Sequence, residues 1–215
     1  MKKQILTLFL LFFASTAHAG TKLNVGGMVV NDEDITFTVA GEHTYEKDEI
    51  QWIADADYSL KIRSGDVFLN RGYIGGKVNY TFDPKQYVFV DTRYDYNQFR
   101  GTPSELIGAV GYGYKLVRTD STKISNEVSA GLLRNSTQTS PVIRNSLWVS
   151  HKFAPKTNFT NKFLIEYTTT KRTFIRNQTE INYEITKNLT FGLRNMYVSD
   201  PVRNNIGSFT LGVKF

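Results

Sequence analysis

Cysteine is absent from the 215 residues of the chain, so no disulfide framework can stabilise it. Only three histidines occur, and without cysteine beside them the sequence does not predict a transition-metal centre. After residue 19 the chain has no run of about 20 apolar residues, the length that a membrane-spanning helix needs. Proline-rich or serine-rich linkers and blocks of like charge are also missing, which favours a single domain without a disordered tail.

The N-terminus has the pattern of a secretory signal. Two lysines precede an apolar core at residues 5–14, and a small-x-small cleavage site ends at Ala19. The core is about ten residues long, which is too short to span a bilayer as a helix. We therefore expect residues 1–19 to be a cleaved signal peptide and residues 20–215 to form the mature domain. An uncleaved N-terminal anchor is the alternative.

Basic residues outnumber acidic ones, with 26 Lys and Arg against 20 Asp and Glu and a formal net charge of +6. The two signs alternate along the chain and form no basic stripe, so nucleic-acid binding is not expected. Gly111 and Gly113 lie in a strand pattern that no helix follows, which excludes a phosphate-binding loop. The sequence predicts no cofactor.

Twelve stretches after the signal segment have strand character and are separated by turn residues. Their spacing of roughly 16 residues suits tilted membrane strands of about 9–11 residues with connections between them. We therefore predict an all-β fold, a closed antiparallel transmembrane β-barrel of twelve strands, with ten strands as the alternative. The expected strands lie near residues 20–30, 34–46, 49–63, 67–82, 86–100, 104–118, 123–134, 142–154, 157–169, 172–186, 188–198 and 205–215.

Apolar and charged side chains occupy opposite parities in these stretches. Successive residues of a strand point to opposite faces, so each parity corresponds to one face of the sheet. One parity carries residues such as Trp52, Ile74, Val90 and Leu193 and is free of charge in five of the stretches. This pattern favours lipid outside and a polar lumen, since a Lys or Arg facing lipid at the midplane costs about 2–4 kcal/mol. A soluble exported barrel or sandwich, with the apolar face inside, is the alternative.

The connections are expected to alternate between tight turns and longer loops, with the tight turns and both termini on the periplasmic side. The predicted tight turns lie at residues 46–48, 83–85, 154–156 and 186–188. Aromatic residues beside these turns predict one interfacial girdle; they include Tyr80, Phe82, Tyr87, His151, Phe153, Phe159, Tyr183 and Phe191. A second girdle is predicted at the opposite end from Tyr94, Tyr96, Tyr167 and Tyr197.

The last nine residues alternate between apolar side chains and small or charged ones. Phe209, Leu211, Val213 and Phe215 share one face, and the chain ends on an aromatic residue. This pattern resembles the closing strand of bacterial outer-membrane β-barrels, whose terminal segment is recognised by the insertion machinery. The resemblance implies an outer-membrane location. It also implies the assembly machinery and periplasmic chaperones as partners during biogenesis.

A second resemblance lies in the middle of the chain. Residues 94–101, Tyr-Asp-Tyr-Asn-Gln-Phe-Arg-Gly, are followed by Gly-Tyr-Gly-Tyr at residues 111–114. This motif resembles the salt-induced outer-membrane proteins, the domain of unknown function 481. The order of hairpins from about residue 34 to the C-terminus is also similar to that family. The resemblance implies an outer-membrane barrel and brings no activity and no catalytic residues.

The charged parity predicts a network of lumen charges. A ladder of ion pairs in a narrow lumen is the favoured interpretation, and a carboxylate site or a cation path is the alternative. Near the ends of the strands, His43 and His151 lie on the apolar parity, which predicts an interfacial position rather than catalysis. The predicted network consists of Asp55, Asp57, Arg71, Lys77, Asp91, Arg93, Asp95, Glu166 and Arg194.

Basic residues also gather where the longer loops are expected. Facing outward, they could meet lipopolysaccharide phosphates, which favour the arginine fork; ordinary solvated loop charge is the alternative. The residues assigned to such contacts are Arg100, Arg134, Lys171 and Arg172, and Arg144 falls in the same group.

Three functions are compatible with these patterns. The first is an outer-membrane structural or stress-linked protein with a charge-paired lumen, which contacts membrane lipid and lipopolysaccharide. The second is a narrow passive pore for small solutes. The third is an enzyme acting on lipid or lipopolysaccharide, which is not expected because no nucleophile and base are paired in the pattern. The oligomeric state is left open.

Overall fold

The structure is a computed structural model, which describes residues 21–30, 34–100, 102–169, 173–199 and 203–214. The predicted signal peptide, Lys171, Arg172 and Phe215 lie outside these residues. Within the described part of the chain, no helix is both long and apolar enough to cross a membrane.

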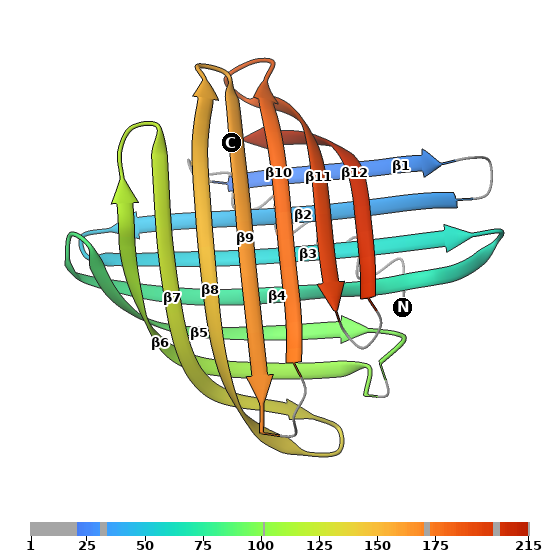
Figure 1. Ribbon diagram of the computed structural model, residues 1–215, viewed down its shortest axis with the longest axis horizontal. Helices are drawn as coiled ribbons and strands as arrows, with labels where there is room; N and C mark the ends of the chain where they lie inside the picture. The colour runs from blue at the N-terminus through green and yellow to red at the C-terminus, as the bar shows by residue number, and fades with distance from the viewer. Residues whose placement is uncertain (1–20, 31–33, 101, 170–172, 200–202, 215) are drawn as a thin grey trace.

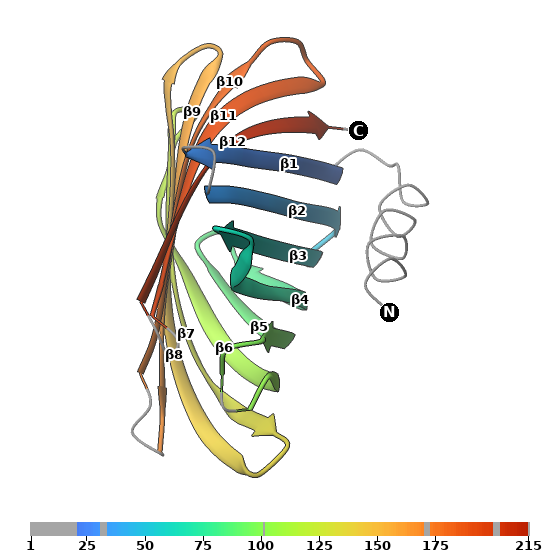
Figure 2. The ribbon, with the colours of Figure 1, turned by 90° about the vertical axis from the view of Figure 1, so that its right-hand side faces the viewer.

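The predicted closed barrel of twelve antiparallel strands is confirmed. Each strand pairs with its neighbours in sequence, and β1 pairs with β12 to close the sheet, with Lys22 opposite Lys214 and Gly27 opposite Phe209. Figure 1 shows β1–β6 passing behind β7–β12, and Figure 2 shows the same barrel from the side. The strands are β1 (Thr21–Val30), β2 (Asp34–Lys47), β3 (Ile50–Arg63), β4 (Asp66–Asp83), β5 (Gln86–Asn97), β6 (Ser104–Arg118), β7 (Thr122–Asn135), β8 (Thr139–Ala154), β9 (Thr157–Thr168), β10 (Thr173–Glu184), β11 (Leu189–Ser199) and β12 (Arg203–Lys214).

The barrel has two ends, which we call proximal and distal. The proximal end carries Thr21, Lys214 and the turns after β2, β4, β6, β8 and β10, and the distal end carries the other connections. The longest connection joins β5 to β6 at the distal end and consists of residues 98–103. The distal turn between β3 and β4, in contrast, is the tight pair Ser64–Gly65, both with positive φ, of 50° and 85°. The difference in length between the proximal and distal connections is therefore smaller than predicted.

The apolar parity lies on the outside of the barrel. Val90, Val110 and Ile143 are 60%, 62% and 60% exposed, although they lie near the middle of their strands. Their neighbours in sequence point inward, so Asp91 and Arg144 lie in the lumen. An outer surface this apolar is what strands in contact with lipid require.

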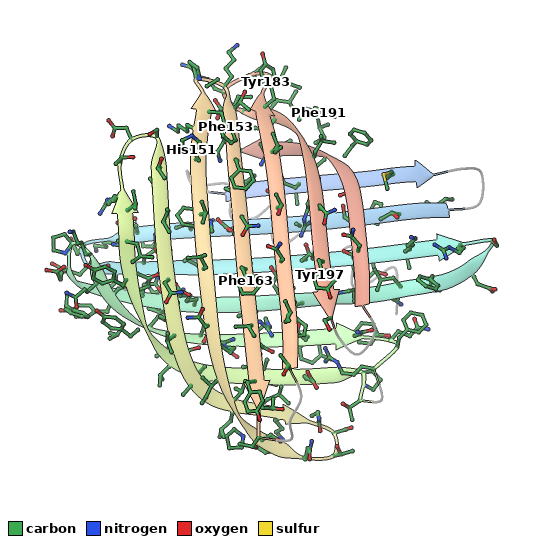
Figure 3. All side chains as sticks on the ribbon, in the orientation of Figure 1. His151, Phe153, Phe163, Tyr183, Phe191 and Tyr197 are labelled. Carbon is green, nitrogen blue, oxygen red and sulfur yellow. The ribbon has the colours of Figure 1, made fainter. Side chains whose placement is uncertain are left out.

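Aromatic residues mark the two ends of the outer face. Figure 3 shows His151, Phe153, Tyr183 and Phe191 near the proximal end of their strands and Tyr197 toward the distal end. The imidazole of His151 lies edge-on to Phe153, with ring centroids 4.7 Å apart. The prediction that Tyr87 belongs to the girdle is wrong, because Tyr87 faces the lumen and is only 6% exposed.

The inward position of Tyr87 explains the glycines of the Gly-Tyr-Gly-Tyr motif. Gly113 lies opposite Tyr87 in the β5–β6 register, and Gly111 lies opposite Phe89. A Cβ added at either glycine would collide with the ring of its partner. The two rings therefore lie against β6, where only glycine leaves room for them.

Candidate functional site in the barrel lumen

The proximal half of the lumen contains a cavity of about 790 Å³. It extends from the turn between β2 and β3 inward to a layer of arginines near the middle of the barrel. Both signs of charge line it, together with aromatic rings. Its polar lining includes Lys22, Glu42, Asp55, Lys77, Lys115, Glu127, Lys162, Gln178 and Glu180.

Four arginines form the floor of this cavity, and we call them and their acidic partners the arginine belt. Its arginines are Arg93, Arg144, Arg176 and Arg194. Its carboxylates are Asp57, Asp91, Asp95, Glu166 and Glu180. These residues come from six strands, because the inward parity of each strand places one to three of them at this level.

Several pairs of the belt cross the lumen. Arg93 on β5 lies 2.5 Å from Glu166 on β9, and its other nitrogen lies 2.5 Å from Asp95. Arg176 on β10 reaches Asp95 at 3.3 Å. None of these cross-lumen partners belongs to adjacent strands, so each pair links opposite walls.

The belt is almost completely desolvated. Arg194 forms an ion pair with Asp57, and their side chains are 2% and 3% exposed. A buried charge that loses its partner is strongly destabilising, because nothing replaces the water it gave up. Arg194 also approaches Glu180 at 3.5 Å and donates a hydrogen bond to Gln178 at 2.9 Å, so the charge is shared among several groups.

Beyond the belt, clusters of apolar side chains pack in the distal half of the lumen. Leu69 of β4 packs in one cluster with residues of β10, β11 and β12, strands that are not its neighbours in the sheet. This cluster therefore crosses the lumen. It consists of Leu69, Phe174, Met196, Val198 and Ile206, with Leu164 packed against it. A second cluster of Ile107, Leu133 and Val142 lies along β6, β7 and β8.

The charge pairs of the proximal half are different. Lys162 lies 2.8 Å from Glu42, but the two side chains are 49% and 43% exposed. Glu127 forms an ion pair with Lys77 and accepts hydrogen bonds from Tyr87 at 2.5 Å and Ser146 at 3.1 Å. The Nζ of Lys77 also lies 4.2 Å from the centre of the Phe89 ring.

Six of the nine predicted network residues lie in the belt, namely Asp57, Asp91, Arg93, Asp95, Glu166 and Arg194. Lys77 belongs instead to the separate Glu127 cluster, and Asp55 lines the cavity beside Gly75. Arg71 is buried at 4% exposure, opposite Asn97 in the β4–β5 register.

Sequence reasoning assigned Arg144 to an outward loop cluster, which is wrong. Arg144 is 6% exposed and forms an ion pair with Asp91. Its guanidinium also lies 4.0 Å from the Glu166 carboxylate. The signal was present in β8, because Ile143 has the exposed, apolar parity and Arg144 therefore points inward.

The expected outward position of Arg100 is also corrected. Its guanidinium lies 2.7 Å from Glu105, and the two side chains are 8% and 2% exposed. The distal β5–β6 connection turns the arginine back onto the wall, and the chain re-enters the barrel at Ser104. Arg134, in contrast, is exposed at the distal end of β7. Lys171 and Arg172 lie outside the described residues.

His151 lies at the proximal end of β8, and the absence of a histidine-based active site stays a prediction. His151 Nδ1 lies 2.9 Å from the Thr122 hydroxyl at the proximal end of β7. Within the same part of the chain, no group of three or more His, Asp or Glu side chains is arranged to hold a metal ion.

In the C-terminal strand, Phe209 and Leu211 are each 50% exposed on the outer face. Val213 is half-exposed on the same parity, and Phe215 lies outside the described residues. The C-terminal strand therefore has an apolar outer face beside β1, and its recognition by the assembly machinery stays a prediction.

A family model described as "Protein of unknown function, DUF481" matches residues 22–205. No curated protein matches the sequence. Among solved structures, the chain is similar in fold to the NanC porin, with 13% identity, a TM-score of 0.60 and coverage of 90% of this chain and 98% of that one. The KdgM porin in complex with disordered oligogalacturonate is 9% identical, with a TM-score of 0.53 over 90% and 98% of the two chains. The translocator domain of the autotransporter NalP from Neisseria meningitidis is 11% identical, with a TM-score of 0.51 over 100% and 96%.

Proposed function

The chain belongs to the family of unknown function DUF481, and from its geometry we propose that it is an integral outer-membrane protein with a closed lumen, a structural or stress-linked component of the envelope. In this proposal the lumen is a cup that opens to the periplasm at the proximal end. The arginine belt and the distal apolar clusters close it toward the cell exterior.

The outer face supports the membrane location. Val90, Val110 and Leu193 are at least half exposed and uncharged, at the level where a bilayer would have its midplane. Apolar side chains are stable when they are exposed to the hydrocarbon of a bilayer, whereas their exposure to water is unfavourable. Spin labels at Val90, Leu193 and Val213 should report acyl chains in reconstituted protein. An aqueous signal at all three positions contradicts the membrane location.

The observation that carries the closed lumen is the set of ion pairs and apolar contacts that join non-adjacent strands. Arg93–Glu166 links β5 to β9, Arg194–Asp57 links β11 to β3, and the Leu69 cluster links β4 to β10–β12. Both layers are formed by wall side chains, so no inserted loop is needed for closure.

Planar-bilayer recording tests this proposal. Purified protein inserted into the bilayer should show no stepwise current, because desolvated side chains span the lumen at two levels. Insertion is checked by protease protection of the same preparation. Regular single-channel steps from the inserted protein contradict the closed lumen.

A narrow passive pore is the second candidate. The fold similarity to the NanC and KdgM porins favours it, and the complex of the KdgM porin with oligogalacturonate suggests a polar solute. Conductance in the same recording, with current reduced by galacturonate oligomers, would support this candidate over the closed cup.

A further inference from the structure

Three cations lie together at the proximal mouth of the cavity, and we call Lys115, Arg118 and Lys123 the mouth corner. Lys115 and Arg118 lie on β6, and Lys123 lies opposite Arg118 on β7. All three line the cavity. In the part of the chain that the structure describes, none of them forms an ion pair with Asp or Glu, whereas the nearby Lys77 pairs with Glu127.

The acidic groups around the mouth corner are held by other partners. Glu127 receives the Lys77 ammonium, the Tyr87 hydroxyl and the Ser146 hydroxyl. Glu46 accepts a hydrogen bond from Gln51 at 3.4 Å, and it attracts Lys115 without forming an ion pair with it. Glu46 offsets part of the charge of Lys115, and the three cations of the corner together leave net positive charge for a solute that enters the cavity.

Lys115 is positioned by an aromatic ring rather than by an acid. Its Nζ lies 5.6 Å from the centre of the Tyr87 ring, which itself rests against Gly113. A ring face attracts a cation without cancelling its charge. The ring thus fixes the ammonium on the cavity wall and leaves it able to pair with an anion.

A flat apolar ring adjoins the three cations. Trp148 of β8 and Lys115 of β6 both lie opposite Ser125 of β7, so they share the inward face of the sheet. Trp148 lines the cavity and is half-buried. A cavity that combines a flat apolar wall with a few convergent charges is typical of a small-molecule site.

We propose that the mouth corner binds a small carboxylate that carries a ring, entering from the proximal side. The carboxylate pairs with Lys115, Arg118 and Lys123, and charge-assisted bonds of this kind are the strong ones. The ring lies on Trp148. The inference rests on the proposed function in one respect, because a cup closed at the belt holds the solute at its mouth instead of passing it.

Calorimetric titration of the full chain in detergent tests the site with two matched probes. Galacturonate and galactose share a ring and differ in the carboxylate, so galacturonate should bind and galactose should not. In the variant K115Q/R118Q/K123Q the affinity for galacturonate should fall about tenfold or more. The control K47Q/K156Q removes two exposed lysines, one at the proximal end of β2 and one in the turn between β8 and β9, and should retain the affinity within about twofold.

Three results would overturn the site: galacturonate affinity unchanged in the triple variant, galactose binding equal to that of galacturonate, or equal binding of inorganic phosphate. Circular dichroism of each variant checks that the barrel is folded. The conductance recording separates this proposal from the closed cup. If the protein conducts and its galacturonate binding still depends on the mouth corner, only the closed lumen is contradicted. If the protein is silent and binds no galacturonate, only the binding site is contradicted.

Discussion

The distal and proximal halves of the lumen hold charge in different ways. Distal to the cavity, arginines pair with carboxylates whose side chains are mostly less than 10% exposed, and apolar clusters lie beyond them. In the proximal half, the Lys162–Glu42 and Lys214–Glu184 pairs are more than 40% exposed. Arginine suits the dry half because its planar fork contacts several acceptors at once, whereas a lysine ammonium is more strongly hydrated. The residue type therefore follows the solvent content of each half.

The largest expected effect comes from removing both layers of the closure on one strand. Arg194 and Met196 are successive inward residues of β11, one in the belt and one in the apolar cluster, with Nη2 and Sδ 3.9 Å apart. The variant R194A/M196A should change the silent barrel into one with discrete single-channel currents, because it opens a continuous path along β11. Planar-bilayer recording measures this change.

The matched control truncates two successive inward residues in the wet half. Gln51 and Ile53 of β3 line the cavity, so Q51A/I53A should widen the cup and leave the protein silent. If the folded double variant of β11 is also silent, the two layers at β11 are not what closes the lumen.

Breaking one buried pair should cost more stability than any single change in the proximal half. In Arg194→Ala the Asp57 carboxylate stays buried at 3% exposure without its main partner. We expect a loss of about 3–5 kcal/mol in the free energy of unfolding. Urea-induced unfolding from lipid vesicles, followed by tryptophan fluorescence, measures it. The second variant R194A/D57A should recover part of the loss, and no recovery would argue against an uncompensated charge as the cause.

Substituting two inward glycines, Gly131 and Gly113, should destabilise the barrel to different degrees, because their surroundings differ in rigidity. A Cβ at Gly131 would meet the backbone carbonyl of Gly108 and the Cα of Ala109, which cannot move independently. The three atoms nearest to a Cβ at Gly113 all belong to the ring of Tyr87, a side chain that has rotatable bonds. We expect Gly131→Ala to cost about 3 kcal/mol and Gly113→Ala about 1 kcal/mol, within the range for overpacking. The same urea assay compares them, and equal losses would contradict the difference in rigidity.

Much of this fold could be predicted from the sequence, because a period of two assigns every residue of a regular strand to one face. The outward position of Val90 and the inward position of Asp91 follow from that rule alone. Tyr87 and Arg144 were misassigned because their residue type, an aromatic and a basic residue near a strand end, was given more weight than their parity. Parity applied strictly would have placed both in the lumen.

The pairing within the lumen could not be predicted in the same way. Parity says that Arg194 points inward, but the strand that faces β11 across the lumen depends on the barrel's closure and register. The ion pair of Arg194 with Asp57 joins residues 137 positions apart in sequence. The apolar clusters that close the distal lumen were not predicted for a second reason. Leu69, Met196 and Val198 lie on the parity that carries the charges, where only polar side chains were expected.

The smallest effect is expected from the exposed pair of the proximal half. Lys162→Gln removes the partner of Glu42, but water already reaches both groups, since they are 49% and 43% exposed. We expect a loss of less than about 1 kcal/mol in the free energy of unfolding, as for surface ion pairs. Because salt screens exposed charges, the loss should shrink further between about 0.1 M and 1 M salt, where the Debye length falls from about 10 Å to about 3 Å. The loss in Arg194→Ala should stay nearly constant over that range, since buried pairs are screened much less. If both variants responded to salt alike in the urea assay, the two halves of the lumen would be equally wet, and the distinction between cup and closure would fail.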